Sequence, residues 1–189
     1  DTSRKYNQVS AQEEELLNVV RQLFDKVIVV INSANVMELG FLEKYNVDAA
    51  INVYYPGNYG TIALGNLLTG KANPSGKTAD TFAYDVSTSP AYVNSGRKDY
   101  VNNSGIRYVD YAEGIYVGYK WYETAYAENF WKSAYAQKTW KYYAESDTDK
   151  GYDKVVQYPF GYGLSYTSFD WKVTDVSFSE GSDKNSLAK

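Results

Sequence analysis

Two residue types are missing from this chain of 189 residues, and each absence removes a class of chemistry. There is no cysteine, which excludes disulfides and thiolate metal sites and leaves the redox compartment undetermined. There is no histidine either, which excludes a serine–histidine triad, an imidazole general base and the usual zinc ligand. We therefore expect no metal site and no cofactor.

Strong charge and long apolar runs are also lacking. The formal net charge is only -4, without an extended basic block, so nucleic acid and anionic membrane surfaces are poor partners. No apolar run approaches the about 18 residues of a membrane helix, and the first residues show no signal peptide. These features leave localisation open between the cytoplasm and secretion. The length suits one ordinary domain rather than two large ones.

Tyrosine is what the chain has in abundance: 21 residues, against 7 phenylalanines and 4 tryptophans. Tyrosine and tryptophan offer flat apolar faces with a polar end, which suits both protein interfaces and stacking on sugars. We favour a tyrosine-rich surface that packs against neighbouring domains, with sugar binding as the alternative.

The first elements alternate between helix and strand. Ser10 and Glu13 form a capping box that opens a helix running to about Phe24. Residues 27–31 are apolar without alternation, as in a parallel strand covered on both faces. A short helical segment over 37–42 and a second strand over 47–54 follow. This order predicts right-handed crossovers and a mostly parallel sheet.

Residues 53–85 form the most specific stretch of the sequence. Pro56-Gly57 ends a strand, and Asn58 is placed to cap the next helix. Gly70 is placed to end that helix in the left-handed conformation, and residues 73–76 (N-P-S-G) have the composition of a type I turn. The helix carries apolar residues that suit one buried face, at Ile62, Ala63, Leu67 and Leu68.

The pattern changes after residue 85. Residues 86–105 are rich in Ser, Asn and Gly and predict a long connection. Residues 111–122 alternate as a strand would, and residues 123–143 indicate one aromatic helix. Residues 166–178 alternate again, as would the first strand of a following β-sandwich.

Three blocks of the sequence resemble glycoside hydrolase family 3, the β-glucosidase family. The first lies in residues 57–82 and includes A-L-G-N-L-L-T-G and N-P-S-G-K; the second, in residues 111–122, reads Y-A-E-G-I-Y-V-G-Y-K-W-Y. The third, in residues 158–169, reads Y-P-F-G-Y-G-L-S-Y-T-S-F. The blocks follow the order of the family's C-terminal α/β sandwich domain, and residues 128–150 have no counterpart.

The resemblance implies a layered α/β sandwich with a mostly parallel sheet, followed by the start of a fibronectin-III-like β-sandwich. On this basis residues 1–85 are part of the α/β sandwich. Residues 86–157 are a connection, a strand and an aromatic helical insertion. Residues 158–189 lead into a truncated fibronectin-III-like domain.

The resemblance also implies hydrolysis of terminal β-linked sugars with retention. Retaining glycosidases use two carboxyl groups about 5–5.5 Å apart. In this family the nucleophile is an aspartate of a TIM barrel, which this chain lacks. The acid/base is a glutamate in a segment similar to G-E-G-x-D-R, whose arginine matches Arg4, so the glutamate falls at or just before Asp1. We expect the chain alone to be inactive and its partners to be that barrel and a β-linked glycoside.

Three residues are candidates for contact with the sugar. Arg4 and Asn35 are possible hydrogen-bond donors, and Asn35 follows the strand over 27–31 at the end where open α/β sheets place ligands. Glu38 is a candidate for the same crevice, although a carboxylate at a helix start is the preferred interpretation. Glu113 is interpreted as positioning its own segment rather than as catalytic.

Two further functions stay open. A non-catalytic carbohydrate-binding module would use exposed tyrosine and tryptophan rings and bind sugar without a partner. A structural domain-interaction module would expose a large apolar face and be poorly soluble by itself.

Overall fold

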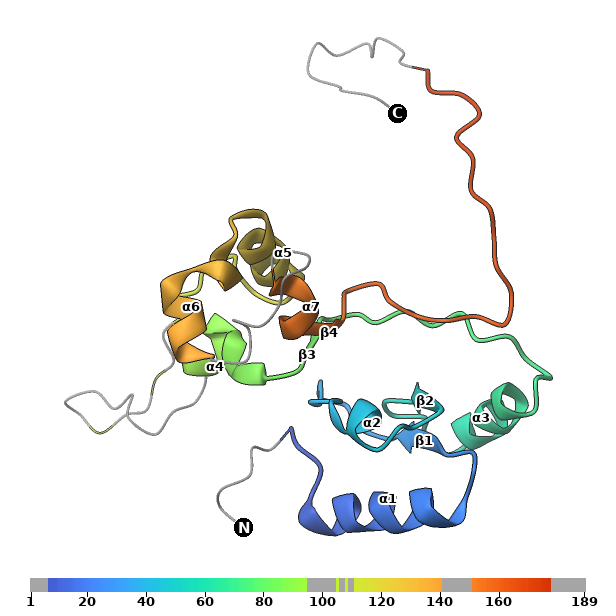
Figure 1. Cartoon of the computed structure of the whole chain (residues 1–189). Helices are drawn as coiled ribbons and strands as arrows, with labels where there is room; N and C mark the ends of the chain where they lie inside the picture. The colour runs from blue at the N-terminus through green and yellow to red at the C-terminus, as the bar shows by residue number, and fades with distance from the viewer. Residues whose placement is uncertain (1–6, 95–104, 106–107, 109–110, 141–150, 178–189) are drawn as a thin grey trace.

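The computed structural model describes residues 7–94, 105, 108, 111–140 and 151–177 (Figure 1). Helices α1 to α3 and strands β1 and β2 gather at one end of the molecule, and α4 to α7 at the other (Figure 1). In chain order the elements are α1 (Ala11–Leu23), β1 (Ile28–Ile31), α2 (Phe41–Lys44), β2 (Ala49–Asn52), α3 (Gly60–Leu68), β3 (Phe82–Ala83), η1 (Val86–Thr88), α4 (Pro90–Asn94), α5 (Tyr119–Ala127), η2 (Phe130–Lys132), α6 (Ala134–Thr139), α7 (Tyr152–Val155) and β4 (Val156–Tyr158).

Helix α1 has the N-terminus that the sequence predicts. The Ser10 hydroxyl accepts the Glu13 N–H at 3.2 Å, and the Glu13 carboxylate accepts the Ser10 N–H at 2.6 Å. This capping box satisfies two donors that the first helical turn cannot satisfy itself. The helix ends at Leu23, one residue before the predicted Phe24, which is extended.

Strands β1 and β2 are parallel, as predicted, with Ile28 opposite Ala49 and Ile31 opposite Asn52. The expectation that both faces of β1 are covered is wrong for this chain. Ile31 is buried, but Ile28 and Val30, which alternate with it, are 53% and 40% exposed. The extent of the sheet also differs from the prediction, because the described residues form one two-stranded parallel and one two-stranded antiparallel sheet.

The covered face of β1 belongs to what we call the strand–helix cluster. Its buried members are Ile31, Leu39, Phe41, Leu42 and Phe82. Side chains of α1 and of the segments flanking α2 pack around them, among them Leu17, Val36 and Met37. Helix α2 starts at Phe41, four residues later than predicted, because the chain first crosses the end of β1 as a loop.

Helix α3 differs from its prediction at the start and matches it at the end. It begins at Gly60 after Tyr59, so Asn58 is not its N-cap, and no side chain caps it. The helix has no buried residue, and Ile62 is 65% exposed, so the predicted buried face is uncovered here. Gly70 has φ +73° and follows the last turn as predicted.

The N-P-S-G segment forms no turn; it runs extended beside residues 159–167. The Asn73 amide oxygen accepts hydrogen bonds from the Ser165 hydroxyl at 2.9 Å and the Tyr166 N–H at 2.8 Å, and its NH₂ group donates to the Thr167 hydroxyl at 2.8 Å. A Cβ on Gly163 would lie 2.2 Å from the Gly76 carbonyl oxygen, so only glycine allows this approach. Long-range pairing therefore overrides the local turn signal.

Strands β3 and β4 are antiparallel and separate two hydrophobic clusters. Phe82 pairs with Tyr158, and both face the strand–helix cluster. Ala83 pairs with Val156, and both belong to the second cluster. We call this second group the aromatic cluster; its buried members are Ala83, Tyr122, Ala125, Trp131, Ala136, Val155 and Val156, with Trp121, Phe130, Trp140 and Tyr152 packed against them.

The predicted strand over 111–122 is wrong. Gly114 and Gly118 have φ +57° and +56°, so the chain turns instead of extending, and α5 starts at Tyr119. The single helix predicted over 123–143 is broken into α5, η2 and α6. Asn129 takes a left-handed conformation, and Ser133 caps α6 by accepting the Ala136 N–H. Residues 141–143 lie outside the described part.

The predicted strand over 166–178 does not form in the described residues, which end at 177. Phe169, Trp171 and Val173 are 72%, 93% and 78% exposed, because no second strand lies beside them. The start of a fibronectin-III-like sandwich therefore stays a prediction, as do the domain limits at 85 and 157. Among the helices that the structure describes, none has the length and hydrophobicity needed to cross a bilayer.

Candidate functional site

The candidate site lies where β1 ends and the chain crosses towards α2. Asn35 is exposed in this loop, in a local turn where its N–H donates to the Ser33 hydroxyl at 3.2 Å and its carbonyl accepts from that hydroxyl at 3.1 Å. Its side chain is thereby presented outside the hydrophobic core. Arg4 lies outside the described residues.

Glu38 is not a helix-start carboxylate, because α2 begins three residues later. One carboxylate oxygen accepts the Gln8 side-chain amide at 2.6 Å, and the other accepts the Val86 N–H at 3.0 Å. Its own N–H donates to the Asn7 carbonyl at 2.9 Å. Glu38 therefore connects three segments that are far apart in the sequence: the entry to α1, the loop after β1 and the start of η1.

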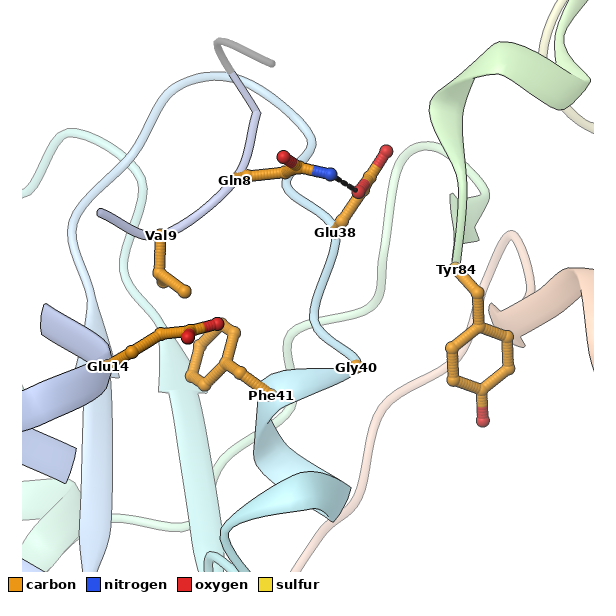
Figure 2. Close-up of a pocket in the computed structure, with 7 residues that line it drawn as sticks. All are labelled: Gln8, Val9, Glu14, Glu38, Gly40, Phe41 and Tyr84. Atoms are coloured by element: carbon orange, nitrogen blue, oxygen red, sulfur yellow. Dashed lines mark hydrogen bonds between the residues drawn. The ribbon is translucent and has the colours of Figure 1, made fainter. Parts of the chain in front are cut away.

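A pocket of about 270 Å³ opens beside this connection. Figure 2 shows the Gln8 side chain hydrogen-bonded to Glu38. Tyr84 lies across from this pair, beyond Gly40. The lining residues are Gln8, Val9, Glu14, Glu38, Gly40, Phe41 and Tyr84. The volume is slightly below the 300–1,000 Å³ typical of drug-sized ligands, so the pocket suits a small polar group.

The other polar groups of the pocket are also engaged. The Tyr84 hydroxyl donates to the Glu43 carboxylate at 2.6 Å. Burial, and then the charge and hydrogen bond of Glu43, raise the pKa of Tyr84 well above its usual value, so the phenol stays protonated. Glu14 accepts from the Lys44 ammonium at 3.2 Å. The pocket thus presents carboxylates whose hydrogen bonds hold the fold.

Carboxylates elsewhere also have structural partners. Glu113 accepts the Asn94 side-chain amide at 2.6 Å, which agrees with a role in positioning its segment. Asp85 caps η1 by accepting the Ser87 N–H at 2.8 Å. The described part of the chain gathers no group of three or more side chains able to hold a metal ion. No pair of described carboxylates is therefore assigned to catalysis.

Gln8 and Tyr84 are two of the pocket residues that the sequence did not indicate. Gln8 lies two residues before the helix cap, and Tyr84 lies two residues after Phe82 in β3. Neither carries a motif of its own. The position of Gln8 just before α1 indicates only that a helix begins there. Its hydrogen-bond partner, Glu38, is 30 residues away in the sequence.

Comparison with known proteins agrees with this architecture. The profile of the Glycosyl hydrolase family 3 C-terminal domain matches residues 1–119. A beta-glucosidase of Ruminococcus albus is 31% identical over 159 residues, which are 84% of this chain and 13% of that protein. Beta-glucosidase A of Butyrivibrio fibrisolvens is 33% identical over 83% of this chain and 15% of its own length.

Other relatives carry a different name or a solved structure. An exo-alpha-(1->6)-L-arabinopyranosidase of Bifidobacterium longum is 29% identical over 85% of this chain and 16% of its own length. The crystal structure of a beta-glucosidase from Paenibacillus barengoltzii matches with a TM-score of 0.66 and 30% identity, over 93% of this chain and 16% of that one. The chain thus spans a small part of the length of its relatives. It belongs to glycosyl hydrolase family 3, of which residues 1–119 match the C-terminal domain.

Proposed function

We propose that this chain is part of a retaining glycoside hydrolase that cleaves terminal β-linked sugars. The chain supplies the α/β domain that walls the active site, while a TIM barrel elsewhere in the enzyme supplies the nucleophile. The observation that carries the proposal is the family match over residues 1–119, together with relatives named as beta-glucosidases.

The connection through Glu38 supports a role beside the acid/base. We expect the acid/base glutamate at or just before Asp1, a few residues ahead of Gln8. The Asn7 carbonyl accepts the Glu38 N–H and the Gln8 side-chain amide donates to the Glu38 carboxylate, so residues 7 and 8 are held against the loop after β1. A catalytic group held within a narrow range of positions loses little entropy on reaching its reactive geometry. Glu38 thus acts as a positioning residue, and Arg4 and Asn35 are the proposed donors to sugar hydroxyls.

The chemistry requires groups from two parts of the enzyme. In the retaining mechanism one carboxyl group protonates the glycosidic oxygen while the nucleophile attacks the anomeric carbon, and the first group then activates water as a base. Glu38 and Glu14 already accept hydrogen bonds within the chain. We therefore assign neither step to them and propose that the chain alone is inactive.

A second candidate is a carbohydrate-binding or domain-interaction module without catalysis. It is favoured by the two tyrosines of the loop between β2 and α3, Tyr55 and Tyr59, which are each 81% exposed. Exposed flat rings stack on sugar faces or on a neighbouring domain. This candidate predicts that the chain binds a sugar or docks to a neighbouring domain and that no hydrolysis follows.

Hydrolysis of p-nitrophenyl β-glucoside distinguishes the two candidates. We expect no hydrolysis by the chain alone and hydrolysis when it is mixed with the barrel segment of the same enzyme. No hydrolysis in a mixture whose two parts are shown to associate would favour the module without catalysis. Hydrolysis by the chain alone would mean that its own carboxylates are catalytic.

The role of Glu38 is tested in the active mixture. Glu38→Gln keeps the shape but weakens the charge-assisted bonds to Gln8 and Val86. We expect kcat to fall about tenfold, with KM little changed and the alkaline limb of the pH profile, which reports the protonated acid/base, displaced. Glu15→Gln, on the exposed face of α1, is the matched control. Equal kinetics for the two variants would exclude the positioning role.

A further inference from the structure

Helix η1 is bound from two sides, by Glu38 and by the aromatic cluster. On one side, the Val86 N–H donates to a Glu38 carboxylate oxygen at 3.0 Å. On the other side, Thr88 is only 1% exposed and is hydrogen-bonded to two side chains of the aromatic cluster. A 3₁₀ helix of three residues has little stability of its own. The orientation of its peptide groups therefore depends on these outside contacts.

Two aromatic side chains of α5 hold Thr88. The Trp121 indole N–H donates to the Thr88 carbonyl at 2.8 Å, and the Tyr122 hydroxyl lies 3.0 Å from the Thr88 hydroxyl. Thr88 uses its own hydroxyl proton to donate to the Asp85 carbonyl at 2.6 Å. A threonine hydroxyl carries one proton, so Tyr122 is the donor to Thr88. Tyr122 is 3% exposed, which leaves little access for a competing water.

The Asp85 carbonyl connects these contacts to Glu38. It accepts both the Thr88 hydroxyl, at 2.6 Å, and the Thr88 N–H, at 3.1 Å. This carbonyl and the Val86 N–H belong to one planar peptide unit, so contacts that fix the carbonyl also fix the direction of the N–H. That N–H is the group that donates to Glu38.

The three hydrogen bonds run in the same direction. Tyr122 donates to the Thr88 hydroxyl, and the Thr88 hydroxyl donates to the Asp85 carbonyl. The N–H of the same peptide unit then donates to the Glu38 carboxylate. Hydrogen bonds in such a chain polarise one another, and a low local dielectric strengthens them. Removal of the first donor therefore weakens the last bond.

We propose that Tyr122 and Thr88 are positioning residues that act through Glu38. The chain of hydrogen bonds from the Tyr122 hydroxyl orients the Val86 N–H towards the Glu38 carboxylate and so holds the loop after β1 against η1. This role rests on the proposed function, in which Glu38 positions the segment of the acid/base. Tyr122 lies beyond residue 119, where the match to the family profile ends. The aromatic cluster thus acts on the proposed site from outside the matched residues.

The test is the Val86 amide signal in ¹H–¹⁵N NMR spectra of the full chain. Tyr122→Phe removes only the first donor of the hydrogen-bond chain. We expect the Val86 amide proton to move to higher field and to exchange with solvent about threefold faster, because its bond to Glu38 is weaker. Tyr119→Phe makes the same chemical change on the same helix, at a ring 42% exposed, and should leave the Val86 signal unchanged.

Thr88 provides a second variant and a rescue. Thr88→Val removes the hydroxyl and should reproduce the effect of Tyr122→Phe, whereas Thr88→Ser keeps the hydroxyl and should retain the native Val86 signal. In the active mixture with the barrel segment, Tyr122→Phe should lower kcat about threefold with KM unchanged, a smaller loss than that of Glu38→Gln. Thermal unfolding of each variant confirms that it is folded, and Tyr122→Phe carries the test if Thr88→Val is unfolded.

Two results would overturn the proposal. Equal Val86 signals in the Tyr122→Phe and Tyr119→Phe variants would exclude the hydrogen-bond chain. Unchanged kcat in Tyr122→Phe, in a mixture where Glu38→Gln lowers kcat, would exclude the positioning role of Tyr122. The NMR measurement needs no hydrolysis, so its outcome is separate from a failure of the proposed role of Glu38, which equal kinetics of Glu38→Gln and Glu15→Gln would show.

Discussion

The strand–helix cluster and the aromatic cluster meet at the β3–β4 sheet but are built in different ways. The strand–helix cluster takes most of its residues from 9–47, a span that contains helices α1 and α2 and strand β1. The aromatic cluster takes its residues from short helices of three to nine residues over 119–155 and from β3 and β4.

This difference shows what holds each region together. In the first, the longest helix, α1, has its own capping box and apolar residues at helical spacing, so its local and tertiary preferences agree. In the second, left-handed residues such as Gly118, Asn129 and Gly151 break the chain into short helices. Helices this short are unstable in isolation, so contacts among large rings must stabilise them.

The largest effect is expected from Trp131→Ala in the aromatic cluster. Trp131 is 0% exposed, and its ring lies 5.2–6.2 Å from those of Trp121, Tyr122, Phe130 and Trp140. We expect the free energy of unfolding to fall by about 4 kcal/mol, measured by urea denaturation. Trp171→Ala, at a side chain 93% exposed, should change it by less than about 0.5 kcal/mol. Similar losses for both would show that the aromatic cluster does not stabilise the fold.

Leu42→Ala tests the strand–helix cluster in the same way. Leu42 is 6% exposed, and its loss should cost about 3 kcal/mol, against less than about 0.5 kcal/mol for Leu16→Ala at 61% exposure. Three of the four tryptophans belong to the aromatic cluster and the fourth, Trp171, is exposed, so a change in tryptophan burial reports the aromatic cluster. Suppose that Leu42→Ala lowers the urea midpoint followed by far-UV circular dichroism but not the midpoint followed by tryptophan fluorescence. The two clusters then unfold separately.

Tyr122 gives the aromatic cluster a dependence on alkaline pH. Burial raises the pKa of Tyr122 to about 12 from its usual 10.0. Above pH 10 the folded state keeps the phenolic proton that the unfolded state loses. The contribution of Tyr122 to the free energy of unfolding is therefore complete below pH 10 and is lost as the pH rises through 12. The expected loss is about 2–3 kcal/mol. Tyr122→Phe should remove that part of the pH dependence in urea denaturation between pH 9 and 12, and an unchanged profile would contradict it.

The smallest effect is expected at the start of α1. Ser10→Ala removes the hydroxyl of the capping box and should cost about 1 kcal/mol, with a small loss of helical circular dichroism. Ser75→Ala, at an exposed residue of the extended N-P-S-G segment, is the control. Equal stability of the two variants would mean that tertiary packing alone holds the helix start.

Part of the candidate site could be predicted from the sequence. Asn35 and Glu38 follow an apolar strand, and the ends of parallel strands face ligands in open α/β sheets. The hydrogen-bond partners of Glu38 could not be predicted, because Gln8 and Val86 lie 30 and 48 residues away in the sequence and carry no motif. Only the folded chain brings these donors to the two oxygens of one carboxylate.

The sequence by itself determined the elements whose signals are local. The Ser10–Glu13 capping box and the left-handed Gly70 each depend on residues within one or two turns. These interactions exist in a short segment and need no partner from elsewhere. The order of helical and apolar segments also indicated the α/β class, and the resemblance of three sequence blocks indicated the family.

The tertiary structure decided the elements that depend on a partner. Residues 73–76 have a turn composition but pair with residues 165–167, and residues 166–177 alternate like a strand but have no strand beside them. The physical reason is that hydrogen bonds between distant segments satisfy backbone and side-chain groups in the folded chain, whereas composition records only the preference of each segment alone.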